Sequence, residues 1–223
     1  MVAMNVFRLL GDMAHLLSFI VMFWKLFTSK SVAGISLKTQ FLYVIVFSFR
    51  YLDIFWNFLS VYNTIMKIIF IASSVSIVCV MKFGTPHKDT YNREDDAFPI
   101  AYLIVPALIL GIAINQDHES PFEMCWAFSI YLEAVAILPQ LFMLQKQGGA
   151  ESLTGHYILL LGLYRLFYIL NWIYRYATEP HYMQLIVWVS GTIQTALYLD
   201  FFYTYMKSKR ERGIDAAIEI DAV

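Results

Sequence analysis

The sequence contains a series of long apolar stretches, each close to the length that a helix needs to cross a lipid bilayer. That length is about 20 mostly apolar residues, because the hydrocarbon core of a bilayer is roughly 30 Å thick. Such stretches lie at about 5–24, 37–56, 62–82, 98–114, 121–144, 154–176 and 182–206. The sequence therefore predicts an all-α membrane protein, with seven transmembrane helices in a single domain over residues 1–223 and a short tail over about 207–223.

Composition supports this class and excludes others. Hydrophobic residues make up 59% of the chain and aromatic residues 17%, well above the values of soluble domains. The net charge of −1 leaves no broad basic surface for nucleic acid. Cys79 and Cys125 lie in separate apolar stretches, and two cysteines are too few for a disulfide framework or a metal site. We therefore expect no metal, no other cofactor and no nucleic-acid partner, with membrane lipid around the helices.

Basic residues are unevenly divided between the two sides of the predicted bundle. They concentrate in the loops after the first, third and fifth stretches and in the tail. Cytosolic loops of membrane proteins carry an excess of lysine and arginine. The N-terminus is therefore expected to face the lumen or the exterior, and the tail the cytosol. The residues behind this orientation are Lys25, Lys30, Lys38, Lys82, Lys88, Arg93, Lys146, Lys207, Lys209, Arg210 and Arg212.

Two segments of the sequence resemble each other and suggest an internal duplication. "SKSVAGISLKTQFLYVIVFSFRYLDIF" and "KQGGAESLTGHYILLLGLYRLFYILNW" each lead from a small polar loop into an aromatic-rich helix with polar residues near its far end. Duplicated halves are common among membrane transporters. The pattern predicts two three-helix repeats, joined by the fourth stretch as a linker helix.

Charged and polar residues recur inside four of the apolar stretches at helical spacing. A charge at bilayer depth costs at least ~2.5 kcal/mol, so such residues normally face a cavity or a partner. We expect them to line one cavity that opens toward the side of the N-terminus. The four stripes are Arg8, Asp12 and His15; Arg50, Asp53 and Asn57; Glu123, Trp126, Ile130 and Glu133; and Tyr164, Tyr168, Trp172 and Arg175.

The three stripe arginines, Arg8, Arg50 and Arg175, have two interpretations. Each could neutralise an acidic residue in a structural ion pair, and for a single arginine this is as reasonable as a ligand role. Three arginines at the same end of different helices favour a shared anionic ligand. Arg165 lies off the stripe of its helix, and there we expect a structural pair with an acidic neighbour. The acidic partners in the structural interpretation are Asp12, Asp53 and Glu123.

His15 also has two interpretations. A single histidine in a helical bundle is commonly a hydrogen-bonded packing residue. Glu133 and Tyr164, placed near the bilayer midplane with it, favour a role in proton sensing, because the charge of imidazole changes between about pH 5 and 8. The tryptophans and tyrosines of the stripes are either packing and interfacial residues or part of the site, since they share faces with the charges.

Five blocks of the sequence closely resemble the KDEL receptors, the ER lumen protein retention receptors. They are "NVFRLLGDMAHLLS", "AGISLKTQ", "FRYLDIF", "SIYLEAVAILPQLFM" and "LYRLFYILNWIYRY", and the likeness covers nearly the whole chain. Pro139-Gln140 also resembles the PQ-loop motif of SWEET-like transporters, which favours the duplicated fold. The family implies a Golgi receptor that binds the C-terminal KDEL or HDEL signal of escaped ER proteins, returns them in COPI vesicles and releases them at the higher pH of the ER.

The resemblance assigns three groups of residues by matching position. Asp53 and Glu123 would meet the basic residue of the signal, and the arginines its carboxylates. The loop "ATEPHYMQ" and the tail "KSKRERG" differ from the family pattern. The signal site would comprise Arg8, Arg50, Tyr51, Asp53, Asn57, Glu123, Trp126, Arg165, Tyr168, Trp172 and Arg175; the proton sensor His15, Glu133 and Tyr164; and the recycling and coat-binding residues Asp200, Lys207, Lys209 and Arg210.

Enzymatic function is not expected, because the sequence shows no nucleophile with its base, metal cluster or phosphate loop. The main alternative is a small-solute transporter, since a duplicated architecture also suits transport. A transporter has to open a midplane site to both sides, whereas a receptor can keep the cytosolic half closed. A purely structural bundle would leave the stripe arginines unexplained.

Overall fold

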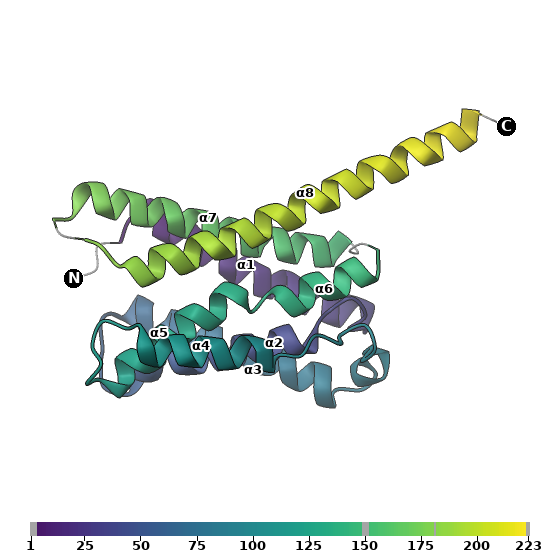
Figure 1. Ribbon diagram of the computed structural model, residues 1–223. Helices are drawn as coiled ribbons and strands as arrows, with labels where there is room; N and C mark the ends of the chain where they lie inside the picture. Colours follow the sequence, from purple (N-terminus) through teal and green to yellow (C-terminus); the bar gives the residue numbers. More distant parts are fainter. Residues whose placement is uncertain (1–3, 149–151, 181, 222–223) are drawn as a thin grey trace.

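The computed structural model describes residues 4–148, 152–180 and 182–221, and within these ranges the chain is helical with no strand. Its elements run side by side as one bundle (Figure 1). They are α1 (Val6–Ser29), α2 (Leu37–Arg50), the short 3-10 helix η1 (Leu52–Phe55), α3 (Val61–Phe83), the 3-10 helix η2 (His87–Thr90), α4 (Ala101–Ala113), α5 (Pro121–Val135), α6 (Leu138–Lys146), α7 (Ser152–Thr178) and α8 (Leu185–Asp221).

Each predicted apolar stretch contains one α-helix, except the fifth, which contains both α5 and α6. Five helical segments in the described chain are long and apolar enough to cross a membrane: Val6–Ser29, Val61–Phe83, Pro121–Lys146, Leu153–Thr178 and Leu185–Thr204. The segment Ala101–Ala113 is apolar but shorter, and α2 has 14 residues. The all-α membrane fold is confirmed.

Polar caps set where several helices begin. In each case a side-chain oxygen accepts a hydrogen bond from a backbone N–H of the first turn, which would otherwise have no partner. Three of the capped helices, α1, α3 and α5, start at the same end of the bundle, so their caps mark that end. The capping residues are Asn5 of α1, Ser36 of α2, Ser60 of α3 and Ser120 of α5.

The fifth predicted helix is broken into α5 and α6 by Pro139. Proline has no N–H to donate to the carbonyl four residues earlier, and its ring clashes with that carbonyl, so the helix kinks before it. Pro139 itself sits in the first turn of α6, where a missing N–H is tolerated.

The second predicted helix, over 37–56, is wrong beyond Arg50. The α-helix ends there, η1 follows, and the chain then runs as a loop to Ser60. The stripe of Arg50, Asp53 and Asn57 is therefore not one helical face, and Asn57 is exposed in the loop. Lys67 of α3 binds the Asp53 carboxylate at 2.6 Å, which holds the turn against α3. No proline or glycine in the sequence marks this helix end.

The packing of the helices repeats when the two halves are exchanged. Helices α1, α2 and α3 correspond in order to α5–α6, α7 and α8. Within each half the third helix packs on the first two, as α3 does on α1 and α2 and α8 does on α5 and α7. Between the halves, α1 packs along α7 and α2 packs along α5. These two contacts are equivalent, because each joins the first helix of one repeat to the middle helix of the other. Helix α4 packs on α5 outside this pattern. The geometry supports the predicted pair of three-helix repeats with a linker.

The apolar core fills the half of the bundle away from the N-terminus. We call the end where α1 begins the amino end, and the end where α8 leaves the bundle the carboxyl end (Figure 1). The residues with no exposed surface come mainly from the last turns of α1 and α3, the first turns of α2 and α7, and α6. They include Leu26, Val32, Ile35, Leu42, Val46, Ile77, Ile137, Met143 and Ile158. Buried polar groups occur in both halves of the bundle, and those of the amino half include Asp12, His15, Glu133 and Arg165.

Candidate functional site

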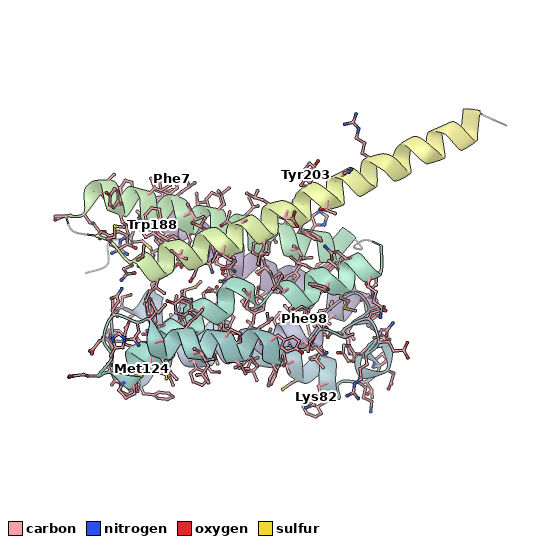
Figure 2. The ribbon with its side chains drawn as sticks, in the orientation of Figure 1. Phe7, Lys82, Phe98, Met124, Trp188 and Tyr203 are labelled. Atoms are coloured by element: carbon pink, nitrogen blue, oxygen red, sulfur yellow. The ribbon has the colours of Figure 1, made fainter. Side chains whose placement is uncertain are left out.

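A polar cavity of about 350 Å³ opens in the amino half of the bundle. Side chains from α1, α2, α3, α5, α7 and α8 line it, and Figure 2 shows the amino end marked by Phe7, Met124 and Trp188, with Lys82 at the opposite end. We call it the polar cavity. Most of the predicted site residues line it: Arg8, His15, Arg50, Tyr51, Asp53, Trp126, Glu133, Tyr164, Arg165, Tyr168, Trp172 and Arg175.

A second cavity, of about 480 Å³, adjoins the first. Arg50, Asp53 and Trp126 line both cavities. Glu123 lines only the second cavity, where its Oε1 atom is buried and has no hydrogen-bond partner among the described residues. Asn57 lines neither cavity. The structure thus brings Glu123 beside the predicted site but leaves Asn57 outside it.

Glu133 is the centre of an ion-pair cluster on the floor of the polar cavity. Its two carboxylate oxygens bind different arginines, Nη1 of Arg50 at 2.8 Å and Nη2 of Arg165 at 2.9 Å. The Tyr164 hydroxyl donates to Glu133 and accepts from Arg165 Nη2 at 2.8 Å. Glu133 is only 3% exposed, and a buried carboxylate needs such partners to offset its lost hydration. The predicted structural pair of Arg165 with an acidic neighbour is confirmed.

The two arginines on Glu133 come from corresponding helices of the two repeats, α2 and α7. Each keeps one buried donor unused: Nη2 of Arg50 and Nε of Arg165 have no partner among the described residues. The Arg50 Nε donates to Ser129 Oγ at 2.8 Å, which fixes the plane of its guanidinium. The floor therefore holds two charged guanidinium groups, each with one nitrogen that has no hydrogen-bond partner among the described residues.

The stripe arginines do not make the ion pairs that the structural interpretation names, although two of them pair with other acidic residues. Arg50 binds Glu133 rather than Asp53, and Arg175 binds Glu179 at 2.8 Å. Arg8 has no ion-pair partner in the described part of the chain. Arg175 also stacks over the ring of Tyr182, with 3.9 Å between guanidinium carbon and ring centroid.

The acidic residues of the stripes have other partners. Asp12 accepts hydrogen bonds from the hydroxyls of Tyr62, at 2.8 Å, and Tyr168. Asp53 binds Lys67, yet its Oδ1 atom is buried without a partner among the described residues. Asp53 lines the polar cavity and keeps it from being uniformly positive, whereas Asp12 is not among the residues that line it.

Lys67 lines the polar cavity and was missed by the sequence analysis. It is a buried lysine on α3, four residues after Asn63, which lines the same cavity. A lysine inside an otherwise apolar stretch is costly unless it faces a cavity or a partner, and that signal was present in "VYNTIMKIIF". Its Nζ also lies 6.0 Å from the centre of the Tyr51 ring.

His15 lies among aromatic rings beneath the arginines. Its ring stacks on Tyr164, with centroids 4.3 Å apart, and Phe19, Phe47 and Phe70 pack around it. The described residues offer its ring nitrogens no hydrogen-bond partner. The predicted trio is contiguous, because Tyr164 touches both His15 and Glu133.

The carboxyl end of the bundle is closed by two matching crossings between the repeats. Gln140 is fully buried: its amide accepts from the Ser36 N–H and donates to the Gly34 carbonyl, both at 2.8 Å, and its own backbone N–H donates to Thr39 Oγ1 at 3.0 Å. Gln140 of the second repeat thus holds the start of α2. It belongs to the predicted PQ motif.

Lys25 of α1 makes the reciprocal crossing. Its ammonium donates to the Ala33 carbonyl at 2.9 Å and to Thr154 Oγ1, near the start of α7, at 2.7 Å. The exchange of halves that relates α1 to α5–α6 also relates these two crossings. Each repeat therefore holds the start of the middle helix of the other.

A buried carboxylate closes the same end further. Asp96 has no exposed surface and accepts from Ser36 Oγ at 2.7 Å and from the Tyr91 hydroxyl at 2.8 Å. Burial, followed by the hydrogen bond to Asp96, raises the pKa of Tyr91, which lies in the loop before α4. The loop is thereby fixed onto the helix starts.

The residues predicted for recycling lie on α8, beyond the cavities. Asp200, Lys207 and Arg210 are exposed, and the side chain of Lys209 lies outside the described residues. α8 continues to Asp221, so the predicted tail prolongs the last helix (Figure 1).

Fold and site together define a multi-pass membrane protein with a charged cavity that opens at one end. A family model described as ER lumen protein retaining receptor matches residues 31–175. The chain belongs to this family.

Several relatives match along most of the chain. An ER lumen protein-retaining receptor of Petunia hybrida is 54% identical over 92% of this chain and 95% of its own length. Receptor A of Arabidopsis thaliana is 52% identical over 91% of this chain and 94% of its own. Receptor 3 of Mus musculus is 51% identical over 91% of this chain and 93% of its own length.

Proposed function

We propose that this chain is a retrieval receptor that binds the C-terminal KDEL or HDEL signal of escaped ER proteins in the polar cavity. The observation that carries the proposal is the Glu133 cluster, in which two arginines share one carboxylate and each keeps an unused donor. A cavity floored in this way accepts a further carboxylate. Family membership supplies the class of function.

The signal offers three carboxylates, those of its C-terminus, its Glu and its Asp. The polar cavity is lined by arginines from three helices that can bind these carboxylates, Arg8 on α1, Arg50 on α2 and Arg175 on α7. Arg8 has no ion-pair partner within the described ranges, and Arg50 has a spare Nη2. Arg175 is held by Glu179, on the loop side of α7, and could exchange that carboxylate for one of the ligand. Charge-assisted and bidentate arginine contacts of this kind are strong and selective for carboxylates.

The basic residue of the signal fits the second cavity. Glu123 and Asp53 each keep an unpartnered oxygen there, and Trp126 lies between the two cavities. Carboxylates and an aromatic face both attract a lysine or a protonated histidine. The two cavities would then hold the two ends of one tetrapeptide.

The charges of the cavity floor supply a reason for pH-dependent binding. Two guanidinium groups against one carboxylate leave one excess positive charge, which opposes a proton on His15 beside them. A ligand carboxylate on Arg50 cancels that excess. Binding and protonation of the imidazole then favour each other, and affinity rises as pH falls. The signal would be held in the acidic Golgi and released in the ER.

The same proposal assigns the two ends of the bundle to two compartments. The amino end with its cavities would face the lumen, because the basic loops lie at the carboxyl end. The exposed residues Lys207 and Arg210, with Lys209, would then contact the COPI coat for return from the Golgi, and Asp200 would act in recycling.

Peptide binding to the purified receptor tests the proposal. A labelled peptide ending in a free KDEL carboxylate should bind tightly at mildly acidic pH and weakly at neutral pH. The same peptide with a C-terminal amide should bind poorly at both. Equal binding of the acid and the amide would reject carboxylate capture.

A small-solute transporter is the alternative, and the exchange symmetry of the two repeats favours it. The reciprocal crossings of Gln140 and Lys25 oppose it, since they close the carboxyl end. Uptake of sugars or amino acids into proteoliposomes above the level of empty liposomes would support the transporter.

A further inference from the structure

A third cavity, of about 420 Å³, lies on the opposite side of α5 and α8 from the polar cavity. Helices α4, α5 and α8 form it, and its walls are almost entirely aliphatic, as at Leu103, Ala107, Ala134 and Val189. Its size is that of a small-molecule site. We call it the apolar crevice.

The apolar crevice faces the bilayer along a membrane-spanning part of the bundle. Leu110, Ile114 and Ile193 on its rim are exposed on the outer surface of the helices. It follows α4 from Tyr102 to Ile114, a rise of roughly 18 Å at ~1.5 Å per residue. That length exceeds the depth of one leaflet, about half of a ~30 Å hydrocarbon core.

The crevice exists because α4 stands outside the repeat. Gly111 allows α4 to lie directly on α5, since a Cβ there would be 2.7 Å from the backbone of Phe128. α8 packs on α5 and α7 instead of closing over α4. The space between α4 and α8 is left open to the membrane.

One polar side chain points to a particular kind of occupant. Ser190 lines the crevice and is only 4% exposed, yet its hydroxyl has no hydrogen-bond partner among the described residues. The Oγ atom itself is not among the fully buried atoms that lack a partner, so the hydroxyl is open to the crevice and has a donor to offer there. Ser190 lies five residues into α8, about 7.5 Å from its start. At that depth the hydroxyl is close to where the ester groups of a phospholipid begin.

A freed backbone carbonyl lies farther along the same crevice. Pro106 cannot donate to the carbonyl of Tyr102, so that group lacks its usual helical donor. Both residues line the crevice.

We propose that the apolar crevice holds one acyl chain of a membrane phospholipid, with the Ser190 hydroxyl donating to an ester carbonyl of that lipid. The aliphatic walls would contact the chain, and the headgroup would lie at the amino end of α8. A site of this kind differs from the general lipid surroundings because it is enclosed on three helices and carries a polar anchor.

The position of the crevice makes the bound chain part of the wall of the polar cavity. On α5, Glu133 faces the polar cavity and Ala134 the crevice; on α8, Val187 faces the polar cavity and Ile186 the crevice. The lipid site itself does not rest on the ligand proposed for the polar cavity, so either can fail alone.

Photolabelling of the wild-type protein tests the site directly. The full chain is placed in phosphatidylcholine vesicles that contain a phosphatidylcholine with a diazirine in one acyl chain, and the labelled residues are mapped by mass spectrometry. Labelling of crevice residues on α4 and α8 should be saturable. Unlabelled phosphatidylcholine with the same acyl chains should displace the label when a short-chain lipid keeps the total lipid concentration constant. Labelling that is non-saturable and equal at Ile109, on the outer face of α4, would show general lipid contact only and overturn the proposal.

Matched variants separate the crevice from the surface. Ala107→Phe fills the crevice, and Ile109→Phe adds the same ring to α4 at a position that is 60% exposed and outside the crevice. Saturable labelling should fall by more than about tenfold in Ala107→Phe and by about fivefold in Ser190→Ala, which loses one hydrogen bond. It should be unchanged in Ile109→Phe. Wild-type labelling in Ala107→Phe would refute the site, and the wild-type map decides the matter if that variant does not fold.

Discussion

The rings of His15 and Tyr164 stack face to face, with centroids 4.3 Å and planes 13° apart. The Tyr164 hydroxyl donates to Glu133, so a charge on the imidazole is one side chain away from the carboxylate that organises the arginines. A change of protonation at His15 therefore bears directly on the part of the cavity proposed to receive the ligand.

Arg50→Lys should weaken binding of a KDEL peptide by more than about tenfold, because lysine keeps the charge but loses the planar, two-pronged donor. Isothermal titration or fluorescence polarisation on the purified variant measures this. Amidation of the peptide should cost less in Arg50→Lys than in the wild type if both changes delete one contact. An affinity close to that of the wild type would remove Arg50 from the site.

His15→Ala should abolish most of the pH dependence of peptide binding. In the wild type, binding takes up a proton, so affinity is high at acidic pH and falls as pH rises; a coupling of about 1.4 kcal/mol gives a tenfold difference. Affinity measured between pH 5 and 7.5 for both proteins decides this. A pH profile in His15→Ala like that of the wild type would place the sensor elsewhere.

Lys67→Met should increase discrimination for a basic residue at the start of the signal. Without its lysine, Asp53 has a full negative charge to offer, so the ratio of affinities for KDEL over ADEL peptides should rise by at least about threefold, or roughly 0.7 kcal/mol. Lys67→Arg keeps the charge and is the control. An unchanged ratio in Lys67→Met would show that the Asp53–Lys67 pair is only structural.

Alanine at Lys207, Lys209, Arg210 and Arg212 should leave peptide affinity intact while the receptor accumulates in the Golgi. The basic run would then be a coat signal in addition to a positive-inside anchor. Fluorescence microscopy of the tagged quadruple variant, beside peptide binding to the same purified protein, measures both effects. Normal recycling would leave only the anchor.

Gln140→Ala should lower the stability of the bundle by about 1–3 kcal/mol, because it strands the buried groups that the amide satisfies. Thermal unfolding of the purified protein should show a lower midpoint. Gln145→Ala, at an exposed position of the same helix α6, should change stability by less than about 0.5 kcal/mol. Equal unfolding midpoints for the two variants would show that the hydrogen bonds of Gln140 do not stabilise the bundle.

The helices could be predicted from the sequence because the length of an apolar stretch is set by the thickness of the membrane. The polar faces of the first, fifth and sixth stretches followed from spacing, which brought Arg8, His15 and Glu133 to one cavity, whereas the stripe of the second stretch did not form one helical face. The end of α2 could not be predicted in this way, since no proline or glycine marks it and the tertiary pair of Asp53 with Lys67 holds the turn.

The ion-pair partners of the charged side chains also could not be predicted from the sequence. Long side chains reach past their nearest neighbours in the sequence, so Arg50 binds Glu133 on α5 rather than Asp53. Lys67 was overlooked although a lysine in an apolar stretch is itself a signal. The duplication, by contrast, was visible in the sequence, and the packing of the two halves follows it.

The reciprocal crossings at the carboxyl end determine how the two halves can move. Gln140 ties the second repeat to the start of α2, and Lys25 ties the first repeat to Thr154 near the start of α7. Spreading that end would rupture both ties together, whereas widening the amino end leaves both intact. We therefore expect any separation of the two halves to occur at the amino end, with the carboxyl end as its pivot.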